Sequence, residues 1–442
     1  MKDICHITGI YTHSVYVILT FLLFTTFLSQ AKDRRKTIDP DFQKSVVWEA
    51  RENNADGYRI PGIVVTTKGT ALAFAEERLL YGDADPKSLV VKRSIDDGFS
   101  WSESIYVEKC DGSFWSENQD QITPSDSKEK KEVWTNICPL IDRETGRIFF
   151  FYALSEGKVA GKNLQRYTRL FYKTSDDDGL NWSERVELTN MMKVKADGLP
   201  NVDKNGKLRT DANGFPCDFM GRSFHMPGPG HGIQLSNGRL LLPVWSRTAL
   251  AVAGKGEIPV EERKYGLGTI YSDDHGMSWK FGSAFGHDGW NMNESRLAEL
   301  RNGDVYINAR YVNPASAGRN NQRIVAKSQD GGVYWGDIHI DKNFPQSNPC
   351  DAGLVSLEKG NNRLLLYSKN ESTDGRKNLV VRVSFNDGKS WPVVKVVDEG
   401  SAGYSDMAAL PDQTVLLIYE TGKNSPVYCI RLNPDWMNEP IN

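Results

Sequence analysis

The chain has 442 residues, of which 39% are hydrophobic and 10% aromatic, and its formal net charge is −3. This length and composition support a large buried core, and the charge argues against nucleic acid as the main partner. A small anionic ligand held by a local cluster of arginines remains compatible with it. The six cysteines contain no close pair with metal-ligand spacing, so neither a zinc site nor a dense disulfide framework is indicated, and one or two disulfide bridges stay open.

The N-terminus carries a candidate export signal. Residues Val15 to Leu28 form an unbroken apolar or threonine run, and Ser29-Gln30-Ala31 supplies small residues at a cleavage site. Because the run is short for a membrane span, residues 1–31 are predicted to be a signal peptide of a secreted or periplasmic protein, with no stable membrane insertion. The basic run from Lys32 to Lys36 leaves an uncleaved anchor as the alternative.

An eight-residue frame, Ser-x-Asp-x-Gly-x-Ser-Trp, dominates the rest of the chain. Its five copies begin at Ser94, Ser175, Ser272, Ser328 and Ser384. The aspartate can accept backbone N–H bonds across a turn, the glycine can adopt a positive φ, and the tryptophan can close the turn onto a sheet. The fifth copy has Asn386 in place of the aspartate. These properties predict hairpin turns between strands.

The flanking segments support this interpretation. The five segments that precede the octets have strand character: 89–93, 168–172, 267–271, 323–327 and 379–383. The last two spacings between octets are both 56 residues, and the longer earlier spacings contain polar insertions at 111–132 and 196–217. Units of this length with four strands each are typical of propeller blades. The sequence therefore predicts an all-β domain over residues 46–442, preceded by a short polar segment, 32–45.

Three arginines stand at strand ends in different units, namely Arg59, Arg310 and Arg376. A single arginine is most often a solvated surface charge. In a closed ring of blades, however, such strand ends converge on the central channel. Other polar residues that could join them are Arg78, Asp83, Asp85, Glu294, Tyr404 and Glu420.

The combined motifs resemble those of the exo-α-sialidase (neuraminidase) family. They are Tyr58-Arg59-Ile60-Pro61, the five octets (the Asp boxes of that family), Gly228–Leu235, Asn293-Glu294-Ser295 and Tyr404-Ser405-Asp406. The resemblance covers nearly the whole chain after residue 31. It implies a six-bladed β-propeller of four-stranded antiparallel blades. It also implies hydrolysis of terminal α-linked sialic acids from glycoproteins, glycolipids or oligosaccharides.

The resemblance assigns a role to each candidate residue. Arg59, Arg310 and Arg376 match the triad that binds the substrate carboxylate, Arg78 lines the same pocket, and Glu420 supports Arg59. Tyr404 matches the nucleophile, Glu294 its base, and Asp83 the general acid and base, with Asp85 as a competing candidate for that last role.

Chemistry independent of the resemblance agrees with these roles. Arginines can make bidentate, charge-assisted bonds to a carboxylate that lysine cannot reproduce. A neutral phenol avoids the repulsion that a carboxylate nucleophile would meet from an acidic sugar. Two successive inversions would make the enzyme retaining. The reaction needs no metal and no organic cofactor, and the oligomeric state stays open.

Two alternatives remain at this point. One is a propeller that binds glycans without catalysis. The other is a related propeller hydrolase for another sugar acid, which would differ in the residues that line the pocket for the N-acyl group. Candidates for that lining are Phe114, Trp115, Phe224 and Trp290, although core or rim packing explains each of them equally simply.

Overall fold

The computed structural model describes seven parts of the chain, residues 42–118, 131–159, 162–163, 165–286, 289–312, 321–359 and 362–437. The predicted signal peptide and part of the polar segment 32–45 lie outside them. Within the described parts, no helix has the length and apolarity needed to cross a membrane. The five cysteines that are described are all buried and unpaired.

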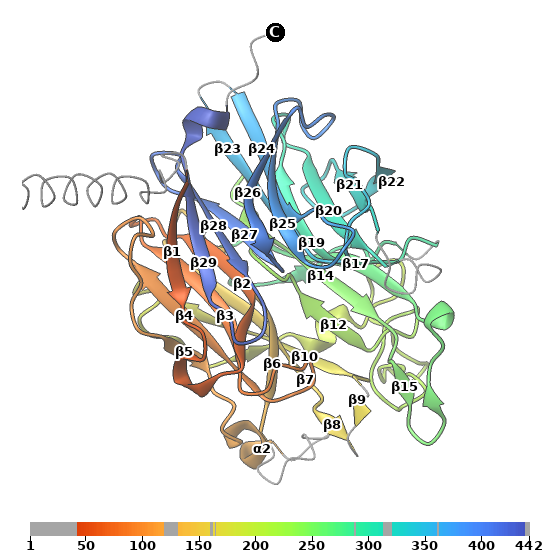
Figure 1. The fold of residues 1–442 in the computed structure, drawn as a ribbon. Coiled ribbons are helices and arrows are strands. Elements are labelled where there is room, and N and C mark those ends of the chain that lie inside the picture. The colour runs from red at the N-terminus through yellow and green to blue at the C-terminus, as the bar shows by residue number, and fades with distance from the viewer. Residues whose placement is uncertain are drawn as a thin grey trace, which may run out of the picture.

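The structure is a ring of small antiparallel blades, and the described strands form six of them, as the sequence predicted (Figure 1). Blade one comprises β2 (Gly57–Val65), β3 (Ala71–Arg78), β4 (Lys87–Ser94) and β5 (Ile105–Glu108). Blade two comprises β6 (Val133–Ile141), β7 (Ile148–Ser155), β10 (Thr168–Ser175) and β11 (Val186–Glu187). These two share one sheet because β4 meets β6 in parallel at Lys87 and Val133.

The other blades follow in chain order. Blade three has its inner strand split into β12 (Phe224–Pro227) and β13 (Ile233–Gln234), followed by β14 (Leu240–Arg247), β17 (Tyr265–Ser272) and β18 (Lys280–Phe281). Blade four comprises β19 (Met292–Glu299), β20 (Val305–Tyr311), β21 (Arg323–Ser328) and β22 (Gly336–Asp341). Blade five comprises β23 (Gly353–Lys359), β24 (Asn362–Asn370), β25 (Lys377–Ser384) and β26 (Val393–Ser401).

The last blade joins both ends of the described chain. It contains β27 (Ser405–Ala409), β28 (Val415–Glu420) and β29 (Val427–Leu432), and its outer strand is β1 (Phe42–Trp48). Because β1 pairs with β29 from Phe42↔Leu432 onward, the ring is closed by strand pairing and leaves no gap between first and last blades. The strand pairing of the last blade therefore includes residues 42–45, which the sequence assigned to the polar segment before the propeller.

Smaller elements lie in the connections. They are β8 (Lys158–Val159), β9 (Lys162–Asn163), β15 (Ala251–Val252), β16 (Gly256–Glu257), the helix α2 (Ser113–Glu117) and the short 3-10 segments at 52–54, 189–192, 260–262 and 434–437. The predicted insertion 196–217 lies within a ladder of isolated bridges, Val194↔Pro200, Val202↔Leu208 and Thr210↔Pro216.

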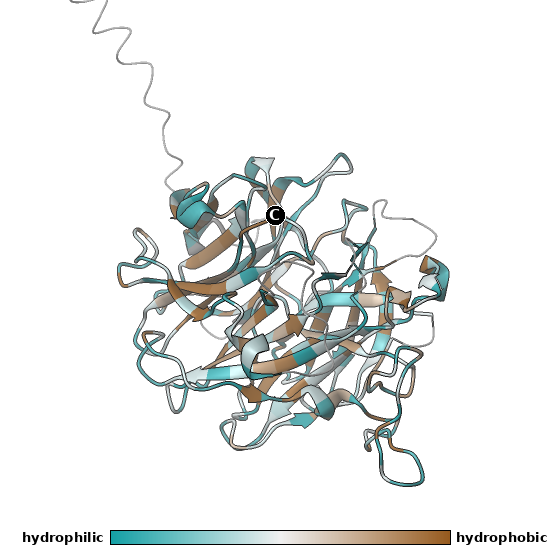
Figure 2. Ribbon diagram, turned by 90° about the horizontal axis from the view of Figure 1, so that it is seen from below, coloured by the Kyte–Doolittle hydropathy of each residue, from teal (hydrophilic) through white to brown (hydrophobic). Residues whose placement is uncertain are grey.

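The hydrophobic core lies between neighbouring blades. Strands β3, β7 and β14 are buried at every position, since each blade packs against the next on both faces. Phe74 of β3 stacks on Phe150 of β7 with 4.9 Å between the ring centroids. Figure 2 shows hydrophobic residues along the strands and hydrophilic ones in the connecting loops.

The five octets form the predicted turns between the third and fourth strands of blades one to five. In the third copy, Ser278 N donates to Asp274 Oδ1 at 2.9 Å, Gly276 N donates to Ser272 Oγ at 2.8 Å, and Gly276 has φ +78°. Asn386 makes the equivalent bond to Ser390 N at 2.9 Å. The last blade lacks an octet because its third and fourth strands come from opposite ends of the chain.

Candidate active site

The register of blade one separates the octets from the predicted site residues. Gly57 of β2 pairs with Arg78 of β3, which pairs with Lys87 of β4, so these residues share one end of the blade. The first octet begins at Ser94, at the opposite end of β4. The octets therefore hold the frame and do not take part in the site.

Arg59 and Glu420 form a buried ion pair between the first and last blades. Arg59 Nη2 lies 3.0 Å from Glu420 Oε1, and their side chains are 11% and 3% exposed. Glu420 Oε2 also accepts the backbone N–H of Ile60 at 2.8 Å. Ile60 has φ 55° within a bulge of β2, a conformation that a β-branched residue adopts only when its surroundings hold it there. Glu420 thus supports both the Arg59 side chain and the backbone of the next residue, Ile60.

Tyr404 and Glu294 form the centre of the site. The Tyr404 hydroxyl donates to Glu294 Oε1 at 2.5 Å, and Arg310 Nη1 donates to Glu294 Oε2 at 2.7 Å and to the Tyr404 hydroxyl at 3.1 Å. Burial, followed by the adjacent Glu294 carboxylate, raises the pKa of Tyr404 well above its ordinary value. The phenol is therefore protonated in the free protein and has a carboxylate in position to accept its proton.

Arg376 completes a cluster of three arginines around Tyr404. It lies in the turn between β24 and β25, and its Nη1 is 3.7 Å from Glu420 Oε1. The guanidinium carbons of Arg376 and Arg59 lie 5.2 and 5.6 Å from the centroid of the Tyr404 ring. The three arginines predicted from blades one, four and five thus meet at one point, as is required of a carboxylate-binding site.

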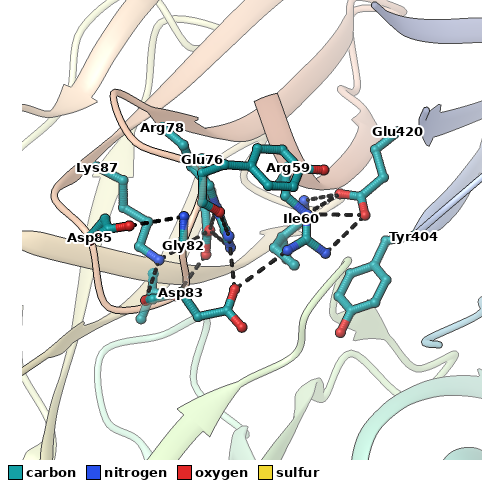
Figure 3. A network of polar contacts seen from close by, with 12 residues as sticks. Arg59, Ile60, Glu76, Arg78, Gly82, Asp83, Asp85, Lys87, Tyr404 and Glu420 are labelled. Atoms are coloured by element: carbon teal, nitrogen blue, oxygen red, sulfur yellow. Dashed lines mark hydrogen bonds and ion pairs between the residues drawn. The ribbon is translucent and has the colours of Figure 1, made fainter. Parts of the chain in front are cut away.

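Asp83 lies in the loop between β3 and β4 and faces two arginines (Figure 3). Its Oδ1 is 2.8 Å from Arg78 Nη1 and 3.4 Å from Arg59 Nη1. The surrounding site partly desolvates this carboxyl and so raises its pKa, but Arg78, Lys87 and Arg59 outweigh that effect and hold the pKa well below its usual value. Because 66% of the side chain is exposed, water screens part of their influence. Asp83 is ionised in the free protein.

Asp85, the competing candidate, points elsewhere. Its Oδ2 accepts the backbone N–H of Gly82 at 3.1 Å, and its Oδ1 pairs with Lys158 Nζ at 2.5 Å. The residue is 7% exposed, and within the described chain its carboxylate bonds to neither Arg59 nor Arg78. The structure therefore places Asp83, and not Asp85, beside the arginine cluster.

Two charged residues of the site were missed in the sequence. Glu76 is fully buried, and its Oε2 accepts bonds from Arg78 Nε at 2.9 Å and Nη2 at 2.5 Å. Lys87 is also buried, and its Nζ donates to the backbone oxygen of Asp83 at 2.6 Å. Burial and Arg78 lower the pKa of Lys87 to about 8. Period-two alternation, which puts Glu76 and Arg78 on one face of β3, was the signal available for Glu76.

The four aromatic candidates for a pocket lining have different positions. Phe114 and Trp115 are 2% and 8% exposed and belong to the core between blades one and two, where Phe114 packs on Trp134. Phe224 is 1% exposed and packs against Trp245, and Trp290 is partly buried against the same cluster. Packing explains Phe114, Trp115 and Phe224. No group of three or more His, Cys, Asp or Glu side chains in the described residues is arranged to hold a metal ion.

The fold and its five octets define a BNR-repeat β-propeller, and a family model described as the BNR repeat-like domain matches residues 104–417. A sialidase of Micromonospora viridifaciens is 31% identical over 379 residues, which are 83% of this chain and 50% of that protein. A Bacteroides fragilis sialidase is 25% identical over 394 residues, 85% of this chain and 62% of that protein.

A solved structure of the Hadza microbial sialidase Hz136 superposes with a TM-score of 0.68 at 23% identity, over 89% of this chain and 69% of that one. This likeness supports the propeller fold. The chain belongs to the sialidase family. It spans about half the length of the Micromonospora protein.

Proposed function

We propose that the protein is a retaining exo-α-sialidase that releases terminal α-linked sialic acids from glycans. The observation that carries this proposal is the buried Tyr404–Glu294 pair with three arginines around it. A neutral nucleophile next to a cation cluster suits a substrate whose reacting carbon bears a carboxylate. A protein that only bound glycans would need the arginines but not a phenol bonded to a buried base.

The proposed first step forms a glycosyl–tyrosine bond. Arg59, Arg310 and Arg376 bind the substrate carboxylate and direct the anomeric carbon toward the Tyr404 oxygen. Glu294 takes the phenolic proton as that oxygen attacks, and Asp83 gives a proton to the departing glycosidic oxygen. In the second step, Asp83 takes a proton from water, the water oxygen replaces Tyr404 on the anomeric carbon, and Glu294 returns the proton to the phenol.

The charge state of Asp83 sets a requirement on this scheme. A general acid must carry a proton, whereas the arginines keep Asp83 ionised in the free protein. The substrate carboxylate brings a negative charge to Arg59, which otherwise faces Asp83 at 3.4 Å. Its binding therefore weakens the pull on Asp83, raises its pKa and favours its protonated form.

The decisive experiment measures fluorophore release from an aryl α-sialoside by the wild type and by Tyr404→Phe. We expect turnover by the wild type and a loss of at least about a hundredfold in kcat/KM for the variant, because the phenol oxygen forms the bond. Tyr367→Phe is the matched control, since this buried tyrosine of β24 has no hydrogen-bond partner for its hydroxyl in the described structure. Full activity of Tyr404→Phe would refute the assigned nucleophile.

A folded wild type without turnover would favour the glycan-binding alternative. The retaining outcome is tested by proton NMR of the first product, which we expect to be the α-anomer. Covalent capture offers a second test, because a Trypanosoma rangeli sialidase has been described with 2,3-difluorosialic acid as a covalent intermediate. Mass spectrometry should place such an adduct on Tyr404. Export of the protein, predicted from the N-terminal segment 1–31, is part of the proposal.

A further inference from the structure

The loop that carries Asp83 is held from outside its own blade. We propose that Lys158, which follows strand β7 of blade two, is a positioning residue for Asp83 and acts through its ion pair with Asp85. This inference rests on the proposed function, since it takes Asp83 to be the general acid and base. The Lys158–Asp85 ion pair connects blade two to blade one and takes no direct part in the reaction steps.

The need for positioning follows from the exposure of Asp83. Its side chain is 66% exposed and stands on the connection between β3 and β4, whereas Tyr404 and Glu294 are buried. A general acid contributes only when its proton lies within hydrogen-bond reach of the leaving oxygen. A small displacement of the loop therefore reduces catalysis without any change in the buried part of the site.

Arg78 and Lys87 hold the backbone of this loop from within blade one. Arg78 Nη1 donates to the backbone oxygen of Tyr81 at 2.9 Å, and Lys87 Nζ donates to that of Asp83 at 2.6 Å. Both donors come from the strands that flank the loop. These bonds fix the loop to the two strands of its own hairpin, but they do not connect it to another blade.

Asp85 supplies the connection to blade two. One carboxylate oxygen accepts Gly82 N at 3.1 Å, on the residue just before Asp83, and the other pairs with Lys158 Nζ at 2.5 Å. A Cβ on Gly82 would lie 2.3 Å from Asp85 Oδ2, so only glycine at this position lets the carboxylate fold back. Gly82 has no positive φ, and its replacement by alanine would disturb this contact rather than the backbone conformation.

The position of Lys158 is itself well defined. It lies three residues after the end of β7, and Glu156 between them is buried and accepts Arg166 N and Nη2, both at 2.8 Å. The Lys158 side chain is 43% exposed, whereas that of Asp85 is 10% exposed. Because the lysine end of this ion pair is open to solvent, water screens part of the attraction, and the pair contributes less to stability than a fully buried one. Its loss should therefore be seen more clearly in catalysis than in the unfolding equilibrium.

Two substrates with different leaving groups distinguish a misplaced Asp83 from a general loss of active-site structure. An aryl leaving group departs without much help from an acid, whereas the alkyl oxygen of sialyllactose needs a proton. We expect Lys158→Ala to lower kcat/KM for α-sialyllactose on the order of tenfold and that for an aryl α-sialoside by less than about twofold. Gly82→Ala should show the same selectivity. Lys162→Ala, which removes an exposed lysine from the neighbouring strand β9, should leave both values unchanged.

Asp83→Ala calibrates the experiment, because it should lose the sialyllactose activity more completely than the aryl activity. Lys158→Ala would lack this selectivity if its kcat/KM were unchanged for both substrates or fell equally for both. If Asp83→Ala shows the selectivity and Lys158→Ala lacks it, the inference about Lys158 is wrong and the proposed function stands. If Asp83→Ala shows no selectivity, the acid role of Asp83 fails, and the inference fails with it.

Discussion

Replacing Glu420 by glutamine tests whether one buried carboxylate organises both the carboxylate-binding site and its backbone. Glu420 Oε1 accepts Arg59 Nη2 at 3.0 Å, and Oε2 accepts Ile60 N at 2.8 Å. A glutamine must put its NH₂ group in place of one of these oxygens. In either orientation the NH₂ group faces another donor, Arg59 Nη2 or Ile60 N, and the side chain is only 3% exposed, so little water can compensate.

The expected cost follows from these contacts. Removing one partner of a buried ion pair typically costs 3–5 kcal/mol, and since glutamine keeps one acceptor we expect Glu420→Gln to lower the free energy of unfolding by about 3 kcal/mol at neutral pH. With Arg59 less firmly held, kcat/KM should fall about tenfold, mainly through KM. Burial raises the pKa of Glu420, but Arg59 and Arg376 lower it further, so the folded-state value lies below the ordinary 4.5. The stability difference is therefore complete above pH 4.5 and declines as the pH falls below it.

Denaturant titrations at pH 7 and pH 4, together with aryl α-sialoside kinetics, check this prediction. Glu399→Gln on the exposed strand β26 is the control for loss of a negative charge. The reasoning would be refuted if Glu420→Gln matched Glu399→Gln within about 0.5 kcal/mol in stability and about twofold in kcat/KM.

Two further predictions concern the framework. Burial lowers the pKa of Lys193 from 10.5 to about 7, so the folded protein releases a proton that the unfolded chain retains, and stability should rise between pH 7 and pH 10 by up to about 1.4 kcal/mol per pH unit. Lys193→Met should lack this contribution in denaturant titrations across that range, and equal slopes would contradict the assignment. In the third octet, Asp274→Asn should change the free energy of unfolding by less than about 0.5 kcal/mol, as Asn386 serves the fifth octet, whereas Asp274→Ala should cost about 1–2 kcal/mol with unchanged kcat/KM. Thermal or chemical unfolding of both variants distinguishes these outcomes.

Local sequence patterns were sufficient for the blade frame. Each octet contains the groups that make its own turn, with the serine hydroxyl and the aspartate carboxylate accepting backbone N–H groups within four residues. The strands beside the octets could be predicted for the same reason, and all five preceding segments lie within β4, β10, β17, β21 and β25. The closing strand β1 was not predicted in full, because its partner β29 is almost 400 residues away in the sequence and has no local signal.

The candidate site residues could be named only because several motifs together resembled a known family. Spacing alone did not connect Glu294 with Tyr404, which lie 110 residues apart, and it did not separate Asp83 from Asp85. Glu76 and Lys87 went unnoticed because a charged residue in a strand is ordinarily a solvated one.

The sequence alone thus determined the repeating turns and strands, since their bonds form between near neighbours. The tertiary structure alone decided which charges meet. Closing the ring brings Arg59 of the first blade onto Glu420 of the last and sets Arg310 and Arg376 around Tyr404. Those distances depend on how six blades pack, and burial between them is what gives the resulting ion pairs and pKa shifts their strength.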